Sequence, residues 1–145
     1  MAETTNPTPT TTTEAPATAV VTKKKKSKRS VPTGQVHILA TFNNTIVAFT
    51  DSKGGVLTTA SAGACGFRGS KKGTAYAAQV ATEKAGNLAR QQHGMSKVDV
   101  FVKGVGLGRD AAIRTLINLN MQVENLTDVT GVKHGGVRPR KARRV

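Results

Sequence analysis

The spacing of apolar residues between positions 35 and 129 constrains the fold of this chain more than any other feature. The first run alternates as a strand with one buried face would, and its apolar members are Val36, Ile38, Ala40 and Phe42. The pair Asn43-Asn44 predicts a tight turn, since asparagine tolerates positive φ. Residues 46–50 and 56–60 are two further strand-like runs, separated by an Asp-Ser-Lys-Gly-Gly turn. Together the three runs predict an antiparallel meander.

After residue 73 the period becomes helical. Thr74 is suited to cap a helix that runs to about Gln92, and Gly94 is well placed to end it. The predicted inner face of this helix consists of Ala77, Ala81, Ala85 and Leu88. Because this face is rich in alanine, we expect the helix to lie close to a sheet.

The rest of the pattern completes one α/β domain. Residues 98–102 and 122–129 are typical of strands, and residues 109–120 of a second helix that buries Ala112, Ile113, Leu116 and Ile117. We predict an α/β fold with a mixed β-sheet in the order β-β-β-α-β-α-β, whose right-handed crossovers each join parallel neighbours. The core should be aliphatic, because aromatic residues make up 3% of the chain and tryptophan is absent.

Positive charge is concentrated outside this domain. The chain of 145 residues has 22 lysines and arginines against 8 acids, and residues 30–132 hold only ten of the basic residues together with six acids. The other basic residues form two acid-free arms, Lys23, Lys24, Lys25, Lys26, Lys28 and Arg29 in one, and Lys133, Arg138, Arg140, Lys141, Arg143 and Arg144 in the other. We predict a disordered Thr-rich segment with a basic arm (1–33), a globular domain (34–130) and a basic tail (131–145).

Such arms predict an anionic partner, because like charges repel one another unless something neutralises them. Nucleic-acid phosphates do so by releasing condensed counterions. A membrane surface is the alternative, but there is no apolar run of about 18 residues and the arms contain no interleaved Leu, Phe or Trp. The first 22 residues resemble neither a secretory signal nor a transit peptide. The single cysteine, Cys65, suits a reducing cytosol, so we expect a cytoplasmic protein.

Two glycine-rich segments are candidate phosphate sites. Gly104, Gly106 and Gly108 lie where a strand gives way to a helix, a position that exposes backbone N–H groups and favours phosphate. The alternative is a tight turn that requires glycine for steric reasons. The second segment, residues 61–73, combines glycines with basic and hydroxyl side chains. Within it, Phe67 is either a stacking partner for an unpaired base or an anchor that holds the loop on the core.

The same strand pattern also suits a metal-dependent nuclease, which needs several clustered carboxylates. The six acids of residues 30–132 form no such motif, and the three histidines lack metal-ligand spacing. We therefore expect no enzymatic activity, no cofactor and no small-molecule substrate.

Residues from about Val36 to Val145 resemble the family of bacterial-type small-subunit ribosomal protein eleven. The similar segments span about three quarters of the chain, in the family's order, and are Thr41–Val47, Ser61–Gly63, Gly66–Lys72, Ala77–Gln79, Val102–Gly104 with Gly106, Gly108 and Arg109, Asp128–Thr130 and Arg138-Pro139. Two segments depart from the family. The tail reads Lys133-His134-Gly135-Gly136 where the family usually has Pro-His-Asn-Gly, and Val105 and Leu107 stand where proline is usual.

The resemblance implies a ribonuclease-H-like fold without catalysis. It implies a place on the platform of the small subunit, bridging 16S rRNA helices beside ribosomal proteins seven and eighteen. It also implies a tail that lines the cleft of the Shine–Dalgarno duplex, near mRNA and initiation factor three. Carried over by position, the rRNA contacts fall on Asn43, Asn44, Arg68, Ser70, Lys71, Lys72, Lys103, Gly104, Gly106, Gly108, Arg109, Lys133, His134, Arg138, Arg140, Lys141, Arg143 and Arg144.

Overall fold

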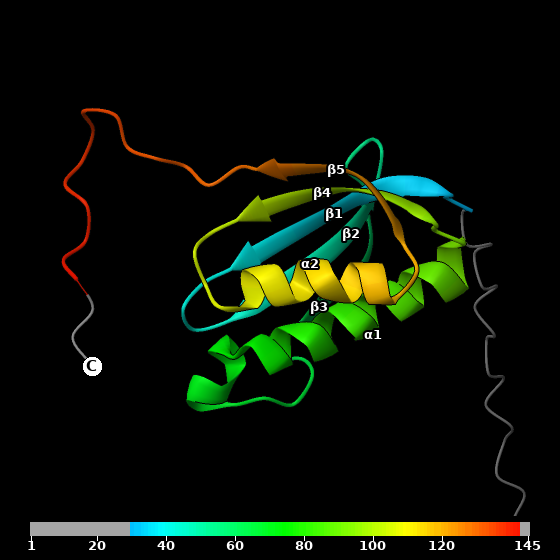
Figure 1. Cartoon of the computed structure of the whole chain (residues 1–145), viewed down its shortest axis with the longest axis horizontal. Helices are drawn as coiled ribbons and strands as arrows, with labels where there is room; N and C mark the ends of the chain where they lie inside the picture. Colours follow the sequence, from blue (N-terminus) through cyan, green and yellow to red (C-terminus); the bar gives the residue numbers. More distant parts are fainter. Residues whose placement is uncertain (1–29, 143–145) are drawn as a thin grey trace, which may run out of the picture.

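In the computed structural model, which describes residues 30–142, five strands form one mixed sheet (Figure 1). In chain order the strands are β1 (Thr33–Ala40), β2 (Thr45–Asp51), β3 (Val56–Ser61), β4 (Lys97–Lys103) and β5 (Gln122–Asp128). A 3-10 helix, η1 (Gly69–Gly73), and the long helix α1 (Ala75–His93) follow β3, and α2 (Gly108–Asn118) connects β4 to β5. A mixed α/β architecture is therefore confirmed, and η1 is an addition to the expected elements.

The sheet order β3-β2-β1-β4-β5 corrects one expectation about the crossovers. The crossover through α2 joins the parallel neighbours β4 and β5. The crossover through α1 does not join neighbours, because β4 pairs in parallel with β1, and both β2 and β1 lie between β4 and β3. This arrangement places Val100 beside Val36 and Val102 beside Ile38, so that the most apolar strands lie together at the centre of the sheet.

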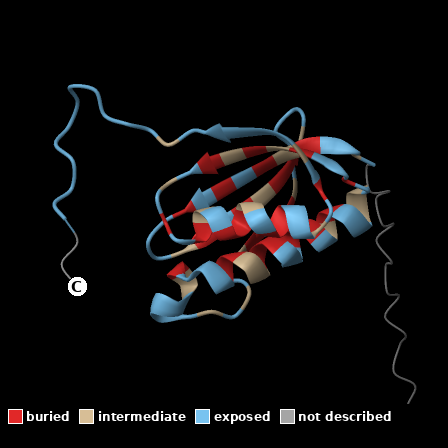
Figure 2. Ribbon diagram, viewed as in Figure 1, coloured by how far each residue is buried: buried red, intermediate tan, exposed pale blue. Residues whose placement is uncertain are grey.

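Both helices cover the same face of the sheet (Figure 1), and the buried residues lie mainly between the two layers (Figure 2). Every second residue of β1 from Gly34 to Ala40 is buried, as the alternation predicts. The core is aliphatic around one large aromatic side chain, Phe49 of β2, which is fully buried. On the opposite face of the sheet the neighbouring rings of His37 and Phe101 stack with centroids 5.1 Å apart.

Helix α1 has the predicted ends. The Thr74 hydroxyl accepts a hydrogen bond from the Ala77 N–H at 3.3 Å, and Gly94 ends the helix in the left-handed conformation. The three predicted alanines of the inner face are buried, but Leu88 is only half-buried and Ala89 takes the fourth core position. The reason is geometric, since residues four apart drift by only about 40° around a helix and a fourth alanine continues the same stripe.

Helix α2 buries most of the predicted face, but the face is shifted around the helix. Ala112 and Leu116 are fully buried and Ile113 is partly buried, whereas the side chain of Ile117 is 60% exposed. The expectation that Ile117 belongs to the core was wrong. The buried stripe instead includes Ala111 and Thr115. These two residues lie on the side of Ala112 and Leu116 that faces away from Ile113 and Ile117.

Candidate nucleic-acid interface

Four segments with predicted RNA contacts meet at one end of the domain. Strands β1, β4 and β5 run parallel, so their carboxyl ends lie at the same edge of the sheet (Figure 1). The β1–β2 turn, the loop before α1, the β4–α2 connection and the start of the tail are all at this end. Hydrogen bonds join the first three of them, because the Gly106 N–H donates to Ala40 O at 3.1 Å and the Ala62 N–H donates to Thr45 O at 3.0 Å.

Some predicted contacts lie outside the described residues. These are Lys23, Lys24, Lys25, Lys26, Lys28 and Arg29 of the first arm, and Arg143 and Arg144 of the tail. The described chain begins at the end of the domain opposite to the four segments, where the Val31 N–H donates to His93 O at 2.8 Å.

The β1–β2 turn is closed by its own hydrogen bonds and presents an aromatic ring to solvent. The N–H and the hydroxyl of Thr41 each donate to Asn44 O at 2.9 Å, and the hydroxyl accepts from the Asn44 N–H at 3.1 Å. Strand β1 ends at Ala40, so Phe42 is part of the turn and not of the strand, and it is 61% exposed. The expectation that Phe42 belongs to the first strand was wrong, although its position directly before Asn43 could have placed it in the turn.

The loop before α1 is held by two of its own predicted functional residues. Arg68 Nη1 donates to Gly63 O at 2.9 Å, and the half-buried Phe67 ring meets Tyr76 edge-on with centroids 5.9 Å apart. The ring contact attaches the loop to α1, whereas Phe67 is not among the apolar side chains packed on the core. Ser70 and Lys71 on η1 are exposed and Lys72 is partly exposed, so their side chains are accessible to a partner.

The glycines of the β4–α2 connection are needed for close packing. Gly104 has a φ of 100°, and a Cβ there would overlap Ala40 O, while a Cβ at Gly108 would overlap Thr45 Oγ1. The backbone N–H groups of Gly104, Gly106 and Arg109 all donate to atoms of the protein. These three N–H groups are therefore used inside the protein, and close packing explains the glycines at positions 104 and 108.

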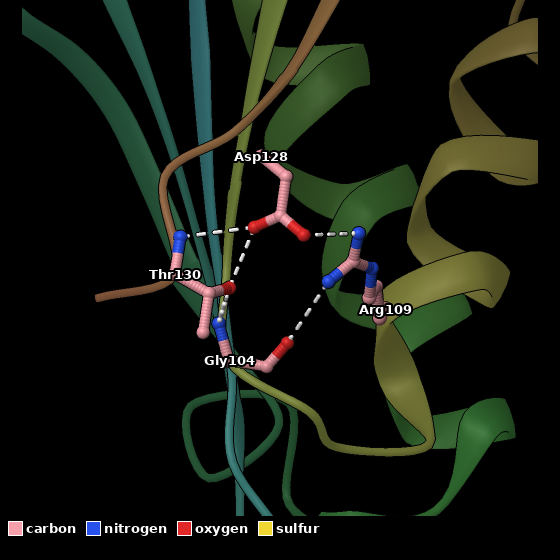
Figure 3. Close-up of polar contacts among 4 residues, drawn as sticks. All are labelled: Gly104, Arg109, Asp128 and Thr130. Atoms are coloured by element: carbon pink, nitrogen blue, oxygen red, sulfur yellow. Dashed lines mark hydrogen bonds and ion pairs between the residues drawn. The ribbon is translucent and has the colours of Figure 1, made fainter. Parts of the chain in front are cut away.

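A small polar cluster ties this connection to the start of the tail (Figure 3). Arg109 Nη2 donates to Asp128 Oδ2 at 2.8 Å, and Arg109 Nη1 donates to Gly104 O at 3.3 Å. The other oxygen of Asp128 accepts from the Thr130 hydroxyl at 2.6 Å and from the Thr130 N–H at 2.9 Å. These bonds from Thr130, and then the one from Arg109, lower the pKa of Asp128 from 3.8 to about 2.

Most other cations at this end have no acidic partner within the described chain. Between residues 30 and 142 only two ion pairs form, Arg109 with Asp128 and Lys97 with Glu124. The predicted contacts that therefore lack an acidic partner in this range are Arg68, Lys71, Lys72, Lys103, Lys133, Arg138, Arg140 and Lys141. Residues 131–142, including His134, are exposed throughout. This excess of positive charge suits a polyanion.

The end of the described tail and the β1–β2 turn border a common cleft of about 540 Å³. Its lining consists of Phe42, Asn43, Arg140, Lys141 and Ala142. The cleft thus combines an exposed ring with two cations and a side-chain amide. Aromatic stacking together with charge neutralisation is how proteins hold single-stranded RNA.

Residues 30–142 contain no group of three or more His, Cys, Asp or Glu side chains that could hold a metal ion. Neither α1 nor α2 combines the length and the hydropathy of a membrane-spanning helix.

The family profile of Ribosomal protein S11 matches residues 34–144. The chain belongs to this family. Members of the Ribosomal protein S11 family are structural proteins of the small ribosomal subunit that bind rRNA and have no enzymatic role. The matched region begins within β1 and includes the tail, so the family covers both the folded domain and the exposed cations beyond it.

Proposed function

We propose that this S11 family member holds 16S rRNA helices together on the platform of the small subunit. In this proposal its domain has the ribonuclease-H-like topology and lies beside ribosomal proteins seven and eighteen. The tail extends to the cleft of the Shine–Dalgarno duplex, close to mRNA and initiation factor three. The basic arm at residues 23–29 and the tail neutralise phosphates, which allows distinct RNA helices to approach one another.

The observation that carries the proposal is the gathering of unpaired cations at the carboxyl end of the parallel strands. The lysines of η1, Lys103 and the described tail cations lie at or beyond this end, and the acids of the described chain pair with none of them. Contacts from such side chains go mainly to phosphate and sugar, which fix position without reading sequence. Selectivity for rRNA then arises from the shape of the folded RNA and from its unpaired bases.

The cleft between the tail and the β1–β2 turn is our candidate for the contact with an unpaired base. In this arrangement the Phe42 ring stacks on the base while Arg140 and Lys141 neutralise the neighbouring phosphates. Phe42 lies outside the hydrophobic core, so a substitution there should change RNA binding and leave the fold intact.

The test is a competition between a folded 16S platform fragment and an unrelated RNA duplex of equal length, at the same salt concentration. The proposal predicts tighter binding of the platform fragment by the full chain. It also predicts that Phe42→Leu weakens binding of the fragment and that Phe42→Tyr, which keeps a stacking ring, does not. Equal affinity of the full chain for the two RNAs would refute the proposal.

A further inference from the structure

The tail leaves the domain through a residue that is bonded to two other segments. Thr130 comes two residues after the end of β5, and its N–H and hydroxyl both donate to Asp128 Oδ1. The same hydroxyl accepts a hydrogen bond from the Gly104 N–H at 3.0 Å. The first turn of the tail is thereby attached to the end of β4 as well as to its own strand.

Arg109 completes this attachment from α2. Its guanidinium bridges Asp128 Oδ2 and Gly104 O, so it contacts both segments that the Thr130 hydroxyl joins (Figure 3). A phosphate that replaced Asp128 as its partner would leave this carboxylate unpaired beside another anion. Like charges at this distance repel, so the geometry opposes a direct phosphate contact by Arg109.

We propose that Arg109, Asp128 and Thr130 form a clamp that sets the direction in which the basic tail leaves the domain. Arg109 is then a positioning residue, although its charge and its place in a glycine-rich connection suggested an RNA ligand. The clamp lowers the entropic cost of binding, because Arg140 and Lys141 of the tail already lie beside the β1–β2 turn. This inference rests on the proposed function, in which the tail binds rRNA.

The substitution Arg109→Lys separates the two roles of Arg109. Lysine keeps the charge and binds phosphate as a point charge, but its single ammonium lacks the planar fork that bridges Asp128 Oδ2 and Gly104 O. The clamp predicts that the variant binds the platform fragment several-fold more weakly, with an unchanged dependence of affinity on salt. Arg138→Lys is the matched control, and we expect it to bind like the unaltered chain.

The salt dependence of two alanine variants gives a second comparison. Each lost phosphate contact should flatten the slope of log K against log salt by roughly 0.7–0.9. We expect this change for Arg138→Ala and no change of slope for Arg109→Ala. Unaltered binding by Arg109→Lys, or a slope for Arg109→Ala as flat as that for Arg138→Ala, would overturn the inference.

The direction of the tail can be measured without RNA. Spin labels at Ser52→Cys and Val132→Cys, both exposed positions, report the distance from the domain to the tail in a Cys65→Ser background. Thr130→Val removes the hydroxyl and should broaden the distance distribution, whereas Thr130→Ser keeps the hydroxyl and should leave it narrow. An equally narrow distribution in Thr130→Val would exclude the clamp.

A variant without residues 133–145 separates failure of the inference from failure of the proposed function. If this deletion leaves the salt slope unchanged, the tail does not bind rRNA and the proposed function fails. If the deletion flattens the slope while Arg109→Lys and Thr130→Val bind like the unaltered chain, the clamp alone is refuted.

Discussion

At the scale of single residues, Asp128 is an exposed carboxylate that three hydrogen bonds keep ionised in strongly acidic solution. Its folded pKa of about 2 lies below the ordinary value of 3.8. A carboxyl group whose pKa is lowered in the folded state stabilises the fold at any pH above its pKa in the unfolded chain. This contribution disappears as the pH falls through about 2. The bonds of the clamp should therefore survive mild acid.

The pKa of Asp128 can be checked by an NMR titration of its side-chain carboxyl resonance. We expect a midpoint of about 2 for the unaltered chain and a shift toward 3.8 in Thr130→Val, which lacks the hydroxyl bond that lowers the pKa most. Thr130→Ser serves as the control and should titrate like the unaltered chain. A midpoint near 3.8 in the unaltered chain would show that these bonds do not form in solution.

At Gly108, the first residue of α2, there is no room for a methyl group. A Cβ there would overlap Thr45 Oγ1 and would lie too close to the Cβ of Ala78. Overpacking of this kind costs about 1–3 kcal/mol, so Gly108→Ala should lower the free energy of unfolding by that amount in urea denaturation. Gly131→Ala is the matched control, because a Cβ at Gly131 meets no atom within 4 Å. Equal stabilities of the two variants would contradict this packing.

At the scale of elements, α2 offers two neighbouring residues that test which helix face is buried. Leu116 is fully buried and Ile117 is 60% exposed. Truncation of a buried leucine costs about 2–5 kcal/mol, so Leu116→Ala should be strongly destabilising. Ile117→Ala should cost less than about 1 kcal/mol, since most surface substitutions have small effects. If Ile117→Ala lowers the free energy of unfolding by clearly more than this in thermal or urea denaturation, Ile117 is buried as the sequence predicted.

The cap of α1 also holds the basic loop in place. The Thr74 hydroxyl donates to Lys71 O at 2.8 Å and accepts from the Ala77 N–H, so it connects η1 to the first turn of the helix. Thr74→Ala should lower the free energy of unfolding by about 1 kcal/mol, and Thr74→Ser should restore most of the loss. Failure of serine to restore stability would show that the methyl group matters more than the hydroxyl.

The strands and the two α-helices were predictable from the sequence because each has a local signal, whereas η1 was not. Alternation located the strands, and Thr74 and Gly94 gave both ends of α1. The strand that pairs with β4 was not predictable, because β1 and β3 are both edge strands of the meander and either could receive a parallel strand. The face of α2 was ambiguous for a similar reason, since Ile113 and Ile117 are as apolar as the residues that the core takes.

The positions of the cations in the candidate site were predictable from the sequence, but their hydrogen bonds and ion pairs were not. Composition located the cations, and the tail and η1 do present them to solvent. No local pattern shows that Arg109 pairs with Asp128, which lies 19 positions away in the sequence. For the same reason the use of the Gly104 and Gly106 N–H groups inside the protein became apparent only from the packing of the β4–α2 connection on β1.

At the scale of the whole molecule, the folded domain has little net charge. Positive charge is concentrated at the carboxyl end of its parallel strands and in the two basic arms. The strands and helices fix the register of the four segments, and the clamp connects the tail to that framework. The Thr-rich segment before the first basic arm contains no lysine or arginine. We therefore assign the electrostatic part of rRNA binding to the arms and to the carboxyl end of the sheet.

The most direct test of this assignment is the salt dependence of binding to the 16S platform fragment by a chain that lacks residues 133–145. Because six cations are lost, the slope of log K against log salt should flatten by several units, at about 0.7–0.9 for each phosphate contact. Deletion of residues 1–22, which removes no cation, is the control and should leave the slope unchanged. A slope that is the same with and without the tail would contradict the account.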